Sequence, residues 1–248
     1  MNREDLRRYI GVTGYSLGQV EKDYFQHIVL GALSRKMAGL LVFKGGTALQ
    51  KTGLLPRFSE DLDFTITGRI ALDKLEETAR TAVESYNYVL DLNNFVDDER
   101  TLGFRLKIQG PLYRNLRGIC TVRIEASKRE EVLLSPRRTE INPPYHDILP
   151  YTLVVMDLEE IAAEKVRTIY TRDRPRDVYD LYRLIEGGTQ MRKELANVKL
   201  EYYDMKFNKK EFLKRCEHIS RRWQGELGSL LEVVPAKREV LKAIEKAF

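Results

Sequence analysis

Apolar residues in the first part of the chain recur at two spacings, one typical of helices and one typical of strands. Residues 16–19, Ser-Leu-Gly-Gln, have the form of a capping box, and a helical stripe follows them at Val20, Tyr24 and Ile28. A second helical stripe is formed by Leu75, Ala79, Ala82 and Tyr86. Short apolar or alternating segments predict four strands, at 40–43, 62–66, 104–108 and 121–126.

The hydrophobic period becomes helical from Asp157 onwards. Asp157-Leu-Glu-Glu160 resembles another capping box, and Pro175 is well suited to the first position of a further helix. Everything after Gly188 has a helical pattern. We therefore expect a mixed α/β (α+β) domain over residues 1–156, with a short mixed sheet flanked by helices, and a helical domain over residues 157–248.

The composition is that of a folded chain. Of its 248 residues, 43% are hydrophobic and 32% are charged, which excludes a disordered protein. The two cysteines, Cys120 and Cys216, have no CxxC spacing, so neither a disulfide scaffold nor a structural zinc site is expected. No apolar run reaches about 18 residues. With no secretion signal at the N-terminus, we expect a cytoplasmic protein with no membrane partner.

The net charge of +5 is unevenly distributed along the chain. Residues 1–188 hold 28 basic and 28 acidic side chains, whereas residues 189–248 hold 14 basic and 9 acidic ones. A basic segment beside a neutral body is one way to attract a polyanion such as nucleic acid. A solvated helical surface rich in Lys and Glu would give the same count.

Two aspartates on one predicted strand are the first candidates for chemistry. Asp61 and Asp63 alternate with the apolar Leu62 and Phe64, so both carboxylates lie on one face of the strand. Two carboxylates this close repel each other unless they are well solvated or a cation lies between them. Mg²⁺ prefers such hard oxygen ligands and is commonly shared with substrate phosphates.

A glycine pair and a third acid strengthen this interpretation. Gly45-Gly46-Thr47 follows the predicted strand at 40–43 and begins a helix, where backbone N–H groups can approach a phosphate closely. An ordinary strand-to-helix turn is the alternative. Glu125 lies on a separate predicted strand and would be the third carboxylate that a two-metal transfer site needs, unless it pairs only with Arg123.

In the helical half, Lys165 falls inside an apolar stripe, where a lysine is costly without a partner. It either extends to solvent or reaches an anionic group such as a triphosphate. Asp177 and Asp180 share an inward face of the next predicted helix. They indicate either an interhelical cluster of ion pairs or a catalytic contribution.

Three blocks, which contain all of these residues except Glu125, together resemble a known family. They are Phe43–Leu49, then Arg57–Phe64, then Glu164-Lys165 with Arg172 and Arg176–Leu181. In this order they are similar to the AbiEii/AbiGii toxin family of nucleotidyltransferases and to the mycobacterial MenT toxins. The resemblance implies a DNA polymerase β-like nucleotidyltransferase core and a helical C-terminal part that completes the cleft. It also implies transfer of a nucleotide from a nucleoside triphosphate to an acceptor hydroxyl, with release of pyrophosphate.

The resemblance assigns roles to the candidate residues. Asp61, Asp63 and Glu125 would hold Mg²⁺ or Mn²⁺, with Glu125 as third ligand or as base. Gly45, Gly46 and Thr47 would bind the triphosphate, Lys165 would neutralise a phosphate, and Asp177 would orient Lys165 or a nearby arginine.

Three functions remain open at this stage. The leading expectation is a toxin of a type IV toxin–antitoxin system that modifies RNA at the 3′ end of tRNA and is counteracted by an antitoxin protein. The alternatives are transfer to a protein hydroxyl and a catalytically inactive protein that binds nucleotide or nucleic acid.

Overall fold

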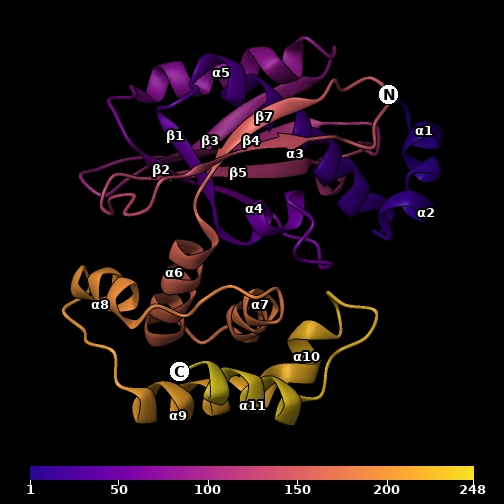
Figure 1. Ribbon diagram of the computed structural model, residues 1–248. Helices are drawn as coiled ribbons and strands as arrows, with labels where there is room; N and C mark the ends of the chain where they lie inside the picture. The colour runs from indigo at the N-terminus through magenta and orange to yellow at the C-terminus, as the bar shows by residue number, and fades with distance from the viewer. The chain divides into compact units, whose positions relative to one another are not determined.

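The computed structural model describes residues 1–248 and contains one seven-stranded mixed sheet (Figure 1), with strand order β3-β4-β5-β2-β1-β7-β6. Two strand pairs, β2 with β5 and β1 with β7, are parallel, and the other neighbours are antiparallel. The strands are β1 (Leu41–Lys44), β2 (Asp61–Ile66), β3 (Val89–Asp97), β4 (Thr101–Gln109), β5 (Cys120–Ser127), β6 (Arg137–Ile141) and β7 (Tyr151–Val155).

The helices fall into an N-terminal and a C-terminal group. The N-terminal helices are α1 (Arg3–Arg8), α2 (Ile10–Thr13), α3 (Leu17–Lys36), α4 (Gly45–Lys51) and α5 (Leu72–Glu84). The C-terminal helices are α6 (Leu158–Thr171), α7 (Pro175–Glu186), α8 (Lys193–Glu201), α9 (Lys209–Ile219), α10 (Trp223–Leu227) and α11 (Lys237–Ala247). The predicted α/β class, with a mixed sheet and a helical C-terminal part, is confirmed.

The chain divides into two compact units. The first, which holds the whole sheet, comprises Met1–Ala48, Phe58–Glu131 and Pro136–Val155. The second comprises the helical segment Met156–Phe248 together with Leu49–Arg57 and Val132–Ser135, two short segments from the N-terminal half of the sequence. The expected domain boundary at residue 156 assigns these two segments to the α/β domain.

The strands form where they do because alternate residues find a core on one face of the sheet. Leu62 and Phe64 of β2 are buried, and they join the core cluster with the central residues of α3 and with Leu75, Ala79 and Val83 of α5. Helix α3 begins as predicted, since Gln19 Oε1 accepts the Ser16 N–H at 2.9 Å. One face of the sheet is thereby committed to packing, and the opposite face is left for polar residues.

Three strands lie outside the four that the sequence pattern predicts: the edge strands β3 and β6, and β7, which lies between β1 and β6. β3 is an edge strand with mostly exposed or half-exposed residues, and a bulge between Asn93 and Val96 breaks its alternation. β6 is the other edge strand and reads Arg-Arg-Thr-Glu-Ile, with only Ile141 buried. Edge strands bury little side-chain area, so their backbone hydrogen bonds hold them in the sheet without an alternating apolar pattern.

The predicted capping box at the start of α6 is only half formed. Asp157 caps the helix by accepting the Glu159 N–H at 2.9 Å. Glu160 is fully buried and instead accepts the backbone N–H groups of Leu133 and Leu134 and pairs with Lys199 at 2.7 Å. This carboxylate joins the short segment Val132–Ser135 to the helical unit. None of the helices combines the length and apolar character that crossing a membrane requires.

Candidate active site

The polar face of the sheet brings the predicted carboxylates together. Asp63 of β2 is the register partner of Glu125 on the neighbouring parallel strand β5, and Asp61 is the partner of Arg123. Register partners present their side chains on the same face of a sheet, and adjacent strands lie about 4.8 Å apart. Asp61, Asp63 and Glu125 therefore share one face, opposite the buried Leu62 and Phe64.

Arg123 lies between two of these acids. Its guanidinium pairs with Glu125 and lies 3.9 Å from Asp61, and all three side chains are between 37% and 44% exposed. The pair with Glu125 is the alternative that the sequence left open, and it coexists with the register of Glu125 beside Asp63. Arg123 thus supplies positive charge where carboxylates would otherwise repel each other.

The glycine pair lies directly against this cluster. Gly45 has a φ of +76°, and a Cβ built on it would come within 2.7 Å of the Asp63 carboxylate. β1 passes into α4 at this residue without an intervening loop. A side chain at position 45 is excluded both by the backbone conformation and by Asp63, so the glycine keeps the backbone and the carboxylate in close contact.

Thr47 is fully buried, and its hydroxyl contacts protein groups. Its Oγ1 lies 2.9 Å from Ser59 Oγ and within hydrogen-bond distance of the Asp61 carbonyl. It therefore connects α4 to the first residue of β2. The Thr47 side chain thus positions β2, the strand that carries Asp61 and Asp63. The backbone of Thr47 belongs, with Gly45 and Gly46, to the segment expected to bind the triphosphate.

Lysine 44 was not among the residues singled out from the sequence, although it belongs to the same face. It is the register partner of Asp63 on β1, is buried, and lies 3.9 Å from the buried Glu130. The row across the sheet is thus Lys44, Asp63 and Glu125 on three adjacent strands. The position of Lys44 directly before the glycine pair is the sequence signal that would have identified it.

These donors suit a hard divalent cation that also binds substrate phosphates. Carboxylate oxygens are the ligands that Mg²⁺ and Mn²⁺ prefer, and Mg²⁺ sites commonly combine one or two protein carboxylates with phosphate oxygens. No three Asp, Glu, His or Cys side chains converge as a complete metal site. The alternating aspartates of β2 therefore fit a cation whose remaining ligands come from the substrate and water.

The helical unit contains a second polar cluster, centred on Lys165 of α6. Its ammonium donates to Asp177 Oδ1 at 2.9 Å and to Asp180 Oδ2 at 2.6 Å, both on α7. Lys165 is only 6% exposed, so it does not extend to solvent. Two of its three N–H donors are satisfied by these carboxylates, and the third has no protein acceptor.

Two arginines complete this network. Arg57 binds Asp180 through two parallel hydrogen bonds of 2.7 and 2.6 Å, and Arg172 binds Asp177 through two of 2.8 and 3.0 Å. Three cations and two carboxylates alternate, which leaves an excess of one positive charge. Arg172 is therefore the nearby arginine that pairs with Asp177. The sequence pattern did not identify Arg57, although it lies in a block that carries the family resemblance.

The network shifts the acidity of its carboxyl groups. Burial by itself would raise the pKa of Asp177, but Lys165 and Arg172 outweigh burial and hold this pKa well below its ordinary value. The pKa of Asp180 is likewise lowered, because Lys165 and Arg57 outweigh the effect of burial. Both carboxylates are therefore ionised at neutral pH.

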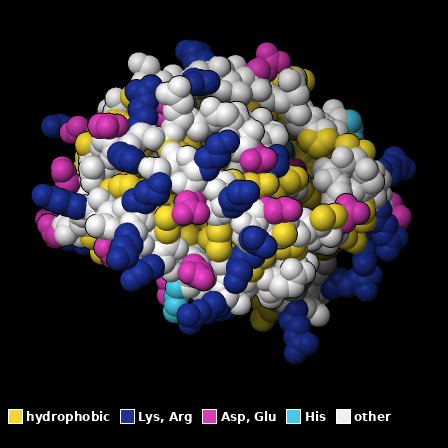
Figure 2. All heavy atoms as spheres, turned by 60° about the horizontal axis from the view of Figure 1, so that its bottom comes forward, with side chains coloured by type: hydrophobic (Ala, Val, Ile, Leu, Met, Phe, Trp, Pro, Cys, Tyr) yellow, Lys and Arg dark blue, Asp and Glu magenta, His cyan; other side chains and the backbone are white.

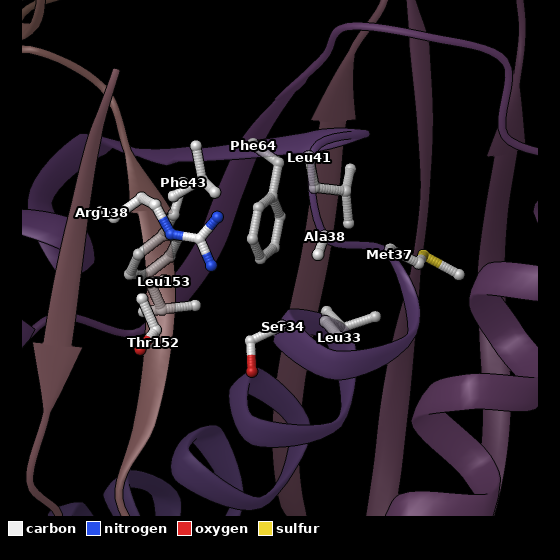
Figure 3. A pocket seen from close by; sticks show the side chains of 11 residues that line it. Leu33, Ser34, Met37, Ala38, Leu41, Phe43, Phe64, Arg138, Thr152 and Leu153 are labelled. Atoms are coloured by element: carbon white, nitrogen blue, oxygen red, sulfur yellow. The ribbon is translucent and has the colours of Figure 1, made fainter.

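A small cavity lies on the other face of the sheet (Figure 3). It has a volume of about 30 Å³ and lies between the end of α3 and strands β1, β2 and β7, with Phe43 and Phe64 in its wall and Arg138 at its side. This volume holds one or two water molecules. Since Phe43 and Phe64 point away from Lys44 and Asp63, the cavity is separate from the carboxylate cluster and is too small for a nucleotide.

Comparisons with known proteins agree with the fold. MenT4, a nucleotidyltransferase toxin from Mycobacterium tuberculosis H37Rv, superposes with a TM-score of 0.67 at 21% identity, covering 100% of this chain and 88% of MenT4. JHP933 from Helicobacter pylori superposes with a TM-score of 0.59 at 18% identity, covering 94% of this chain and 90% of that one. These likenesses establish the nucleotidyltransferase toxin fold. No curated protein matches the sequence.

A family model assigns the sequence independently of these structures. The model described as nucleotidyl transferase AbiEii toxin, type IV toxin–antitoxin system, matches residues 30–248, which include every candidate site residue named above. The chain therefore belongs to the AbiEii family of nucleotidyltransferase toxins.

Proposed function

We propose that this enzyme transfers a nucleotide from a nucleoside triphosphate to a hydroxyl of RNA, at the 3′ end of tRNA, in a reaction that depends on Mg²⁺ or Mn²⁺. The observation that carries the proposal is the row of acids on β2 and β5 beside Gly45, because this row joins metal-ligating oxygens to a backbone that a phosphate can approach. An antitoxin protein is the expected partner of a toxin in this family.

The reaction exchanges a phosphoanhydride bond of the nucleoside triphosphate for a phosphodiester bond to the acceptor. The acceptor oxygen forms a bond to the α-phosphorus, the bond from that phosphorus to the bridging oxygen of the β-phosphate breaks, and pyrophosphate leaves with that electron pair. The acceptor hydroxyl gives up its proton. Glu125 serves either as the base that takes this proton or as the third oxygen ligand of the metal.

The chain's residues contribute by position and charge. Asp61 and Asp63 would hold the divalent cation, which neutralises phosphate charge when it is bound. The backbone of Gly45, Gly46 and Thr47 binds the triphosphate. Lys165 donates its remaining N–H to a phosphate oxygen, and Asp177 with Asp180 holds its ammonium in place.

A transfer assay with each labelled nucleoside triphosphate and total tRNA tests the proposal. Label recovered in tRNA supports it, and mass analysis of the product then locates the added nucleotide. Label recovered only in protein would overturn the RNA acceptor and favour transfer to a protein hydroxyl. Label that remains free with both Mg²⁺ and Mn²⁺ would overturn the proposed reaction.

Asp63→Asn tests the site itself. We expect transfer to fall by about a thousandfold or more, because one ligand and its negative charge are lost where charge must be neutralised. The fold should be unaffected, since Asp63 lies on the polar face of the sheet. Asp73→Asn, at an exposed aspartate of α5, is the matched control and should keep full activity. Full activity of Asp63→Asn would remove the carboxylate pair from the mechanism.

A further inference from the structure

Helices α9 and α11 border an open groove of about 690 Å³ in the helical unit. Phe248, directly after α11, packs against Phe212 near the start of α9 with ring centroids 5.0 Å apart, so the two helices run antiparallel (Figure 1). Five cationic side chains line the groove, and all five are exposed: Lys210, Lys214, Lys237, Arg238 and Lys242.

The two helices present the same pattern to this groove. Residues 209–217 read Lys-Lys-Glu-Phe-Leu-Lys-Arg-Cys-Glu, and residues 237–245 read Lys-Arg-Glu-Val-Leu-Lys-Ala-Ile-Glu. In both, the fourth and eighth residues are buried, and the second, fifth, sixth and ninth line the groove. Because the helices are antiparallel, this shared pattern distributes its cations along the whole groove instead of collecting them at one end.

The positive charge of the groove is not compensated within the protein. None of the five cations forms an ion pair or a hydrogen bond through its side chain, and the two acids of the groove, Glu217 and Glu245, are likewise without a cationic partner. The groove therefore carries an excess of three positive charges. Figure 2 shows this side of the molecule, where many Lys and Arg side chains surround strips of apolar surface. Such a surface attracts a partner with regularly spaced negative charges.

The lining of the groove favours nucleic acid over a protein segment. Its apolar part consists of Leu213 and Leu241 alone, both half-buried, and no aromatic residue takes part. The central part of a protein interface is typically apolar and aromatic and poor in lysine, whereas nucleic-acid interfaces are polar and strongly positive. Without an aromatic side chain for base stacking, the contacts would be to phosphates.

We infer that the groove between α9 and α11 is a docking surface for the phosphate backbone of the RNA acceptor. This inference rests on the proposed function, and it adds a surface distinct from the carboxylate cluster and from the Lys165 network. The lysines and Arg238 contact successive phosphates, so the groove contributes affinity and orientation and reads no base sequence.

The test is equilibrium binding of total tRNA, without nucleotide, across a series of salt concentrations. The groove variant carries Lys214→Gln, Arg238→Gln and Lys242→Gln. The control variant carries Lys36→Gln, Arg69→Gln and Lys74→Gln, which removes the same charges from exposed residues of the sheet-containing unit. Each phosphate contact contributes about 0.7 to 0.9 to the slope of log K against log salt, so the groove variant should lose about 2 from the wild-type slope.

The control variant should keep the wild-type slope, and thermal unfolding should show that both variants fold. A groove variant with the slope of the control would overturn the inference. The inference would also be overturned if the groove variant bound tRNA as the wild type does but no longer bound an acidic peptide such as poly-glutamate. The occupant of the groove would then be a protein. Asp63→Asn separates this inference from the proposed reaction, because it should lose transfer while it keeps the salt slope.

Discussion

At the scale of single residues, the absence of a Cβ atom at Gly45 determines how closely the backbone approaches the Asp63 carboxylate. The backbone there has a positive φ, and the Asp63 carboxylate occupies the space in which a Cβ would lie. Gly39 has nearly the same φ, +79°, but nothing lies within 4 Å of the position of its Cβ. Alanine substitutions at the two glycines therefore distinguish the free-energy cost of a strained backbone, present at both, from the cost of a steric clash, present only at Gly45.

We expect Gly45→Ala to lower both stability and transfer, because the new methyl group displaces the Asp63 carboxylate in addition to straining the backbone. Gly39→Ala carries only the strain, about 1 kcal/mol, and should keep full transfer activity. Urea unfolding and the tRNA transfer assay measure the two effects. Equal losses of transfer in both variants would mean that the contact between Gly45 and Asp63 has no catalytic importance.

At the scale of elements, the ion network of Lys165 joins α6 and α7 with Arg57. Asp177 and Asp180 are almost completely buried, so their charges are tolerable only because each is bound by two cations. Removing one member leaves an opposite charge buried without its partner, which typically costs about 3–5 kcal/mol. The network therefore holds the helices at a fixed spacing while leaving one ammonium N–H for a ligand.

The lowered pKa of Asp177 predicts how this contribution depends on pH. A carboxyl whose pKa is lower in the folded than in the unfolded state contributes stability above the unfolded value, about 4, and loses it as the pH falls through the folded value. We expect Asp177→Asn to be less stable than the wild type by a constant margin from pH 7 to about pH 5. The margin should narrow below about pH 4.

Urea unfolding at several pH values measures this margin. Asp173→Asn is the control, because Asp173 lies between the same two helices but is 47% exposed and pairs with Arg215 at the surface. Its effect should stay within about 1 kcal/mol at every pH. A margin for Asp177→Asn that is equally small at pH 7 would show that the buried network contributes nothing to stability.

At the scale of the whole molecule, charge is organised in two ways. Three acids, Asp61, Asp63 and Glu125, lie together on the polar face of the sheet, where Arg123 already offsets part of their repulsion. Cations are in excess over the last 60 residues, and the five that line the groove between α9 and α11 are without partners. The three acids suit substrate phosphates, which they would bind through a divalent cation. The unpaired cations suit a polyanionic acceptor, which they would bind directly.

Removing divalent cations should therefore separate activity from folding. We expect EDTA to abolish transfer and added Mg²⁺ or Mn²⁺ to restore it. The unfolding temperature should not change, because the carboxylates near the site are half-exposed and Arg123 compensates them. Transfer that continues in excess EDTA would contradict the proposed dependence on Mg²⁺ or Mn²⁺. A large fall in the unfolding temperature would indicate a structural metal instead.

The amino-acid sequence by itself determined the fold class, the four central strands β1, β2, β4 and β5, and the longer helices. Central strands and long helices bury one face, so their residues must follow a period of two or of 3.6, and this period is visible in the sequence. It also determined the family, through three short blocks that follow one another in order. The edge strands β3 and β6 escaped this reasoning because they bury little and need no such period.

Only the tertiary structure decided which polar residues meet. The register between β2 and β5 places Glu125 beside Asp63, and this register depends on how two strands more than 50 residues apart are paired. Arg57 meets Asp180 across 123 residues of sequence, and the groove between α9 and α11 exists only because the two helices lie side by side. Local patterns report what a residue buries, whereas the partners of a buried charge are set by long-range packing, which no local pattern encodes.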